Sequence, residues 1–152
     1  MTVRTVEIRI ATEQDSDAIL AAHMNAFVEG PVFAKLVDEM LDDPSGEPTL
    51  SLVTEPSTGL VGHLLFTSVR MEPHYRQVRA RIFAPLAVVQ NRQRLGIGRR
   101  LSQAGFRQLE GAAVNLMFVV GYLDYYSRFK FKPATVQVLE ETYPIPLQDA
   151  DA

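Results

Sequence analysis

The stretch VVQNRQRLGIGRRL, residues 88–101, decides the fold. It begins with two β-branched residues that favour a strand and ends in a pattern that begins an amphipathic helix. Four arginines and two glycines, Gly96 and Gly98, lie within it. Glycines at a helix start let a bulky anion approach N–H groups that lack partners, and the helix dipole favours negative charge there. A diphosphate fits this pattern, whereas a tight turn without a ligand is the alternative.

Composition indicates one globular domain over residues 1–152, with 47% hydrophobic and 22% charged residues. No apolar run approaches the ~20 residues of a membrane span. The first ten residues, MTVRTVEIRI, lack the continuous apolar region of a signal peptide. The sequence has no cysteine, and its three histidines are widely spaced. We therefore expect a cytoplasmic domain without a metal site and without membrane contact.

Charge is distributed unevenly along the chain. Nine arginines and a single acid, Glu72, lie between Arg70 and Arg107, although the whole chain has a net charge of −3. This predicts a cationic surface suited to a polyanionic partner, unless the arginines merely coat a helix. Nucleic acid is not expected, because no lysine or aromatic residue is interspersed with the arginines of residues 92–107.

Strands and helices are expected to alternate without repeats. Thr12, with Asp15 three residues later, is expected to cap the first helix, and Pro31 to open the second. The turn sequence PSTG, residues 56–59, predicts a hairpin. The order predicts an α/β (α+β) fold, a mixed sheet with helices on both faces. We expect strands at 6–10, 49–55, 60–71, 80–89, 113–121 (central) and 132–141, with helices at 11–28, 31–41, 97–110 and 123–129.

LAVVQNRQRLGIGRRL, residues 86–101, has the pattern Gln/Arg-x-x-Gly-x-Gly/Ala after a strand and resembles the acetyl-CoA loop of the GNAT superfamily of N-acetyltransferases. GYLDYYSRFKFKPA, residues 121–134, resembles that superfamily's second signature, aromatic-Tyr-x-x-aromatic-Gly-Phe. Residues 8–27 and 50–69 also resemble the superfamily, particularly its YhbS-like branch. The resemblance covers roughly residues 6–146 and implies the acyl-CoA N-acyltransferase fold, with a mostly antiparallel central sheet.

The resemblance also implies acetyl-CoA as the acetyl donor, with no metal. Backbone groups of Ala87, Val88 and Val89 would meet pantetheine. Residues 93–98 would line the pyrophosphate, with Arg99 at the helix start. Arg92 or Arg94 would meet the 3′-phosphate. Tyr126 matches the family's catalytic tyrosine, which protonates the departing CoA thiolate. The implied cofactor-binding residues are Ala87, Val88, Val89, Gln93, Arg94, Leu95, Gly96, Ile97, Gly98 and Arg99.

The implied reaction is acetyl transfer to a primary amine, small-molecule or peptide, by direct attack. The alternative for Tyr126 is a packed aromatic residue without a catalytic role. The alternative for the whole chain is a catalytically silent acyl-CoA-binding regulatory domain. Lys130 stands where the family has a glycine, which leaves the placement of Tyr126 open.

A further apolar strand, common in relatives, has no match after residue 146. Either the sheet has an uncovered edge, or a homodimer partner completes it, or the chain continues further. The strand before the loop carries no Glu to act as general base. The general base is therefore left undecided between His63, Glu72, His74, Glu29 and a water molecule. His63 is expected to be packed.

Overall fold

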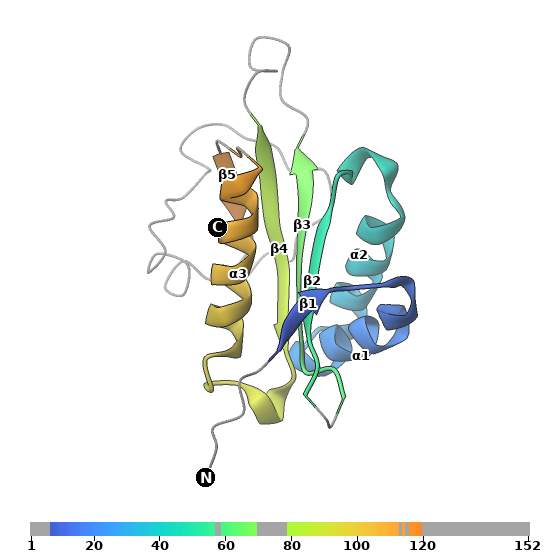
Figure 1. Ribbon diagram of the computed structural model, residues 1–152. Helices are drawn as coiled ribbons and strands as arrows, with labels where there is room; N and C mark the ends of the chain where they lie inside the picture. Colours follow the sequence, from blue (N-terminus) through green and yellow to red (C-terminus); the bar gives the residue numbers. More distant parts are fainter. Residues whose placement is uncertain (1–6, 57–58, 70–78, 113, 115, 120–152) are drawn as a thin grey trace.

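The computed structural model describes residues 7–56, 59–69, 79–112, 114 and 116–119. A five-stranded sheet carries helices on both faces (Figure 1), which confirms the predicted fold class. The strands are β1 (Ile8–Ile10), β2 (Leu50–Thr54), β3 (Gly62–Val69), β4 (Ala80–Val88) and β5 (Leu116–Val119). The helices are α1 (Ser16–Ala26), α2 (Gly30–Asp42) and α3 (Ile97–Gly111), with 3₁₀ turns at Glu13–Asp15, Pro44–Gly46 and Gln90–Arg92.

The sheet is mixed and mostly antiparallel, in the order β1-β2-β3-β4-β5. The first four strands pair antiparallel, including the predicted β2–β3 hairpin, and β4 pairs parallel with β5. Because a parallel pair needs a crossover, α3 connects β4 to β5 across one face of the sheet. Among the described residues β5 is the last strand of the order, and the predicted elements at 123–129 and 132–141 lie outside those residues.

Successive side chains of a strand point to opposite faces of the sheet, so the core consists of two layers. Leu52, Leu64 and Phe66 pack on the α3 side, where Leu101 of α3 is also fully buried. Val53 points to the opposite face and packs with Ile19 of α1 and Val37 of α2. These two layers hold α3 against one face of the sheet and α1 and α2 against the other.

Two glycines allow α3 to lie close to the sheet. A side chain at Gly62 would come within 3.0 Å of Leu101 and 3.2 Å of Ile97, at the first turns of α3. A side chain at Gly105 would overlap the ring of Phe66. The start of α3 is therefore fixed by packing over the start of β3, next to the end of β4.

The first helix begins later than the sequence pattern indicates. The Thr12 N–H does donate to Asp15 Oδ2 at 2.7 Å, as in a capping box, but this box closes a 3₁₀ turn and α1 starts at Ser16. Arg9 of β1 binds the same carboxylate through two hydrogen bonds, of 2.8 and 2.9 Å. The ion pair draws Asp15 toward β1, so the chain completes a separate turn before the helix.

A proline inside β4 coincides with an irregularity of the sheet. The β3–β4 register shifts between Leu64 and Phe66, where β4 carries one residue more than β3. Pro85 lies within that shift, and a bulge accommodates a residue that has no N–H to donate. In the part of the chain that the structure describes, no helix is long and apolar enough to span a bilayer.

Candidate functional site

The segment between β4 and α3 has an unusual backbone. The chain leaves β4 at Val88, makes the 3₁₀ turn Gln90–Arg92 and enters α3 at Ile97. Arg94 has φ 64° and Gly96 has φ 82°, both in the left-handed region. For a side-chain-bearing residue such as Arg94 this region costs about 1–2 kcal/mol. Strain of this kind is concentrated at functional sites, so the segment is a candidate binding loop.

The N-terminus of α3 is open to an anion. Its N-cap, Gly96, offers no side-chain hydrogen bond, and the first N–H groups of a helix have no partner within the helix. Among the described residues, a side chain at Gly96 would meet nothing within 4 Å, so there is open space beside this residue. Glycine at this position therefore serves the left-handed turn, while the open space beside it suits an anion.

Backbone direction distinguishes the three strand positions predicted to meet pantetheine. The Val89 N–H donates to the Val61 carbonyl at 2.9 Å, so these residues form a hydrogen-bonded pair of the ladder. Bonded and non-bonded pairs alternate in an antiparallel ladder. Val88, opposite Gly62, is therefore non-bonded and points its N–H and C=O away from β3, whereas Ala87 points its groups toward His63. Of the three residues, Val88 presents both backbone groups on the β5 side of β4.

The carbonyl of Val88 has a partner within the loop. Gln93 Nε2 donates to it at 2.9 Å across the 3₁₀ turn. The described part of β5 pairs with Ala80–Phe83, farther back along β4. A ligand lying along the end of β4 would therefore meet the Val88 N–H directly, and would meet its carbonyl together with the Gln93 amide.

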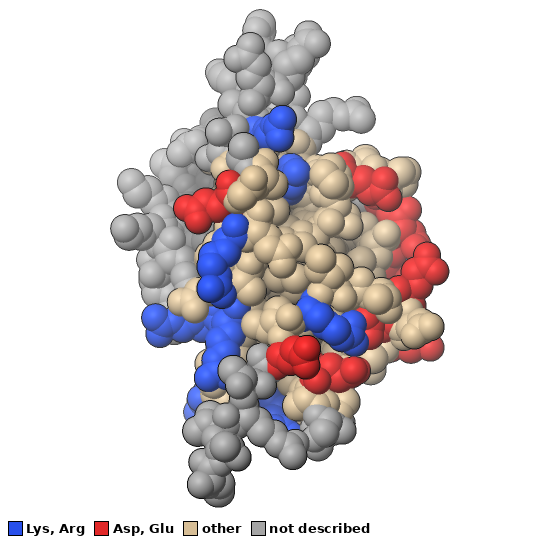
Figure 2. Space-filling model, in the orientation of Figure 1, with Lys and Arg blue, Asp and Glu red and all other residues tan. Residues whose placement is uncertain are grey.

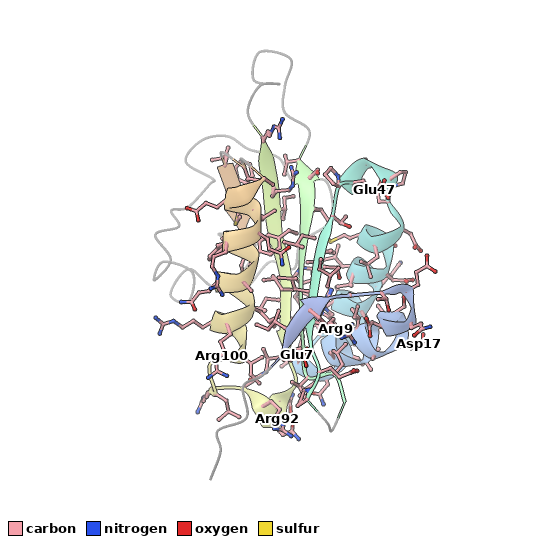
Figure 3. The ribbon with its side chains drawn as sticks, in the orientation of Figure 1. Glu7, Arg9, Asp17, Glu47, Arg92 and Arg100 are labelled. Atoms are coloured by element: carbon pink, nitrogen blue, oxygen red, sulfur yellow. The ribbon has the colours of Figure 1, made fainter. Side chains whose placement is uncertain are left out.

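Positive charge surrounds this segment. Arg94, Arg99, Arg100 and Arg107 are exposed. Figure 3 places Arg100 beside the first turn of α3 and Arg92 in the preceding 3₁₀ turn. In Figure 2 the blue side chains gather over α3 and the loop before it, whereas the red ones gather over α1 and α2. Arg92, Arg94, Arg99 and Arg100 therefore place positive charge at the start of α3, whereas Arg79 and Arg81 lie at the other end of β4.

The predicted loop residues are together in space around this helix start. Gln93, Arg94, Leu95 and Arg99 are exposed, Leu95 with 59% of its surface, and Gly98 is half-buried. Ile97 is buried and packs in the core below α3, so only its backbone faces the loop side. Tyr126, Glu72 and His74 lie outside the described residues. Glu29 is exposed, directly before α2.

His63 belongs to a buried polar chain. Its Nδ1 lies 2.8 Å from His23 Nε2 of α1, and its Nε2 lies 2.8 Å from the Ser51 hydroxyl. Both imidazoles are fully buried, and burial lowers the pKa of His23 to about 3. Burial and the neighbouring His23 also hold the pKa of His63 well below its usual value. His63 is thus packed, as expected, and both its ring nitrogens are engaged.

Sequence reasoning did not identify His23 or Asn25 as parts of this region. His23 is 40 residues from His63, and Asn25, whose side chain accepts a hydrogen bond from the Gln90 N–H at 2.8 Å, is 65 residues from Gln90. Neither residue lies in a local motif that would indicate these contacts. Within the described ranges no three acidic or histidine side chains gather as metal ligands would.

The chain is similar to known N-acetyltransferases. No family model matches it. It is 34% identical over 147 residues to the "Uncharacterized N-acetyltransferase YjhQ" of Escherichia coli strain K12, covering 96% of this chain and 81% of that protein. A solved GNAT family acetyltransferase from Brucella melitensis, in complex with acetyl-CoA, superposes with a TM-score of 0.72 at 29% identity, covering 84% of this chain and 83% of that one.

A second solved structure extends the match over nearly the whole chain. The GNAT family N-acetyltransferase YhbS from Escherichia coli, in complex with CoA, has a TM-score of 0.79 at 25% identity and covers 99% of this chain and 82% of its own. The sheet and helices described above therefore form a known fold. Taken with the identity to YjhQ, this shows that the chain belongs to the GNAT superfamily of N-acetyltransferases.

Proposed function

We propose that this protein transfers the acetyl group of acetyl-CoA to a primary amine by direct attack, without a covalent enzyme intermediate. Acyl transfer from an acyl-CoA is the chemistry of its superfamily, and two similar structures contain acetyl-CoA or CoA. Membership in a superfamily of N-acetyltransferases also favours an enzyme over a silent acyl-CoA-binding domain. The acceptor is a small molecule or a peptide that carries a primary amine.

The open start of α3 is the observation that carries this proposal. The open space beside Gly96, the first N–H groups of α3, which have no acceptor within the helix, and the exposed Arg94 and Arg99 suit the pyrophosphate of CoA. This assigns the loop from Gln93 to Gly98, including Leu95, to the pyrophosphate. The left-handed Arg94 fits the same role, because a left-handed residue in a turn is a feature of backbone concavities that bind anions.

The end of β4 suits the pantetheine arm of CoA. Pantetheine contains two amides, and an amide chain pairs with backbone groups that a neighbouring strand does not use. Val88 presents such groups on the β5 side. In the proposed complex the pantetheine arm runs along Val88, with Ala87 and Val89 shaping the strand on either side.

The chemical step transfers acetyl directly. The amine nitrogen attacks the thioester carbonyl carbon, the C–S bond breaks, and the thiolate leaves with a proton from Tyr126 in the assigned role. A phenol of pKa ~10 is protonated at neutral pH and can donate to a thiolate whose conjugate thiol has a pKa near ~8.5. The sequence has no cysteine to form a thioester with the enzyme. The proton lost by the amine passes to water or to a base that this proposal does not assign.

Cofactor binding is tested by thermal unfolding. Acetyl-CoA at a hundred times its Kd should stabilise the fold by about 2.7 kcal/mol. Dephospho-CoA and adenosine should stabilise it less, because the loop contacts phosphates. If saturating CoA left the melting temperature unchanged while added RNA raised it, the proposal would be refuted in favour of a nucleic-acid-binding protein.

A further inference from the structure

Asn25 connects α1 to the end of the cofactor strand. Its Oδ1 accepts a hydrogen bond of 2.8 Å from the backbone N–H of Gln90, across 65 residues of sequence. Gln90 is the second residue after β4 ends at Val88 and the first of the 3₁₀ turn. This contact therefore lies where the strand becomes the loop.

The Gln90 N–H comes directly after the last hydrogen bond between β4 and β3. The last bond from β4 toward β3 is the one from the Val89 N–H to the Val61 carbonyl, at 2.9 Å. Within the turn, the Arg92 N–H donates to Val89 and the Gln93 N–H to Gln90, so the first N–H of the turn has no backbone acceptor of its own. The Asn25 side chain fills this place, acting as a cap contributed by another element.

Asn25 is carried on a firmly held helix. His23, two residues before it, is fully buried and bonded to His63 of β3. His63 is in turn paired across the sheet with Ala87 of β4. The same helix is therefore attached to the sheet beside Ala87 and, through Asn25, to the chain at Gln90. These two attachments bracket Val88.

We infer that Asn25 is a positioning residue for the pantetheine arm of the cofactor. By holding the Gln90 N–H it fixes the point at which β4 turns away, and so the direction of the Val88 N–H and C=O. Asn25 acts through the backbone, and no contact between Asn25 and the cofactor is required. The inference rests on the proposed function, because it assumes that pantetheine lies along Val88.

The test compares Asn25→Leu, which removes the acceptor, with Asn25→Asp, which keeps an acceptor oxygen. Each variant and the parent are titrated calorimetrically with CoA and with adenosine 3′,5′-bisphosphate, which carries phosphates but no pantetheine. Asn25→Leu should bind CoA about tenfold more weakly, as expected for one lost hydrogen bond. Its affinity for the bisphosphate should stay within about twofold of the parent, since the loop around Gly96 is unchanged.

The ratio of the two affinities is the readout, because an added negative charge or a general loss of stability acts on both ligands. Asn25→Asp should have the same ratio of CoA affinity to bisphosphate affinity as the parent. Asn91→Leu, the same substitution at an exposed amide of the same 3₁₀ turn, should also leave it unchanged.

The outcomes separate this inference from the function on which it rests. If the parent binds CoA and Asn25→Leu has the parent ratio, or if Asn25→Asp fails to restore it, Asn25 does not position the cofactor strand. If the parent binds neither ligand, the proposed function fails and the role of Asn25 fails with it.

Discussion

His23 Nε2 and His63 Nδ1 lie 2.8 Å apart in the core, where one ring donates its hydrogen to the other. Burial, and not the bond itself, favours the state in which both imidazoles are neutral. A proton added to either ring would place a positive charge in a site that is fully buried. This pair joins α1 to β3, so charging either ring would destabilise the fold.

The pair should make the protein sensitive to acid well above the range where carboxylates titrate. An unfolded histidine has a pKa near 6.5, whereas burial lowers that of His23 to about 3. Between these values the unfolded chain binds more protons than the folded one, so stability is full above pH 6.5 and is lost as pH falls toward 3. Each histidine can contribute a slope of up to about 1.4 kcal/mol per pH unit.

Urea unfolding at pH 7.5, 6.0 and 5.0 measures this slope. The neighbouring Asp15 does not mask it. Its hydrogen bonds to Arg9 hold the pKa of the carboxyl below the usual 3.8, so its contribution is retained until the pH falls below that value. A free energy of unfolding that is constant from pH 7.5 to 5.0 would mean that the buried pair takes up protons as readily as unfolded histidines do.

Gly105 should be required for the packing of α3. A Cβ there would overlap the ring of Phe66, which is fully buried and stacks edge-on with Phe83. Gly105→Ala should therefore destabilise the fold by about 1–3 kcal/mol, despite the better helix propensity of alanine. Gly111→Ala is the matched control, since its Cβ would meet nothing within 4 Å and should leave the melting temperature equal or slightly higher. Equal melting temperatures for the two variants would contradict the packing described here.

The loop should lose its ligand when Gly98 gains a branched side chain. Gly98→Val is expected to abolish CoA binding and leave the fold largely intact, because its side chain would fill the space in front of the helix N–H groups. The checks are calorimetry and circular dichroism. If Gly98→Val binds CoA as the parent does, the glycines serve the turn alone.

Arg99 should contribute through charge. Arg99→Ala is expected to weaken CoA binding less than Gly98→Val does, and the loss should shrink as salt is raised. Arg107→Ala removes the same exposed charge eight residues farther along α3, about 12 Å from Arg99. That control should change the affinity for CoA little. A loss at Arg107 equal to that at Arg99 would indicate a diffuse attraction in place of a phosphate site.

Tyr126 should matter for turnover and hardly for binding. Tyr126→Phe keeps the ring and removes the proton donor, so acetyl-CoA affinity should be nearly unchanged while kcat falls by about 10²–10⁴. Tyr125→Phe should cost little. A slow Tyr125→Phe would move the role by one residue, and two fast variants would show that thiolate departure needs no protein acid.

The sequence predicted elements well where one local pattern decides. The start of α3 at Ile97 follows from an amphipathic repeat behind a glycine turn, and the β2–β3 hairpin from a turn sequence between two apolar runs. The start of α1 was placed too early, because an ion pair with Arg9 of another strand draws Asp15 into a separate turn.

Contacts between distant residues could not be predicted. No local pattern joins His23 to His63, or Asn25 to Gln90, because the helix–sheet packing that brings them together is a property of the whole fold. The loop residues from Gln93 to Arg99 could be proposed as a group, because the residues around a helix start are adjacent in the sequence. The direction of the Val88 backbone, by contrast, required the register of the sheet.

The most direct test of the account is release of CoA thiol from acetyl-CoA, followed with a thiol reagent across a panel of primary amines. The account predicts slow release without an amine and fast, saturable release with at least one of them, together with a stoichiometric amount of N-acetylated amine. Release that is equally fast without any amine, or no release with any amine under conditions where CoA binds, would contradict direct acetyl transfer to an amine.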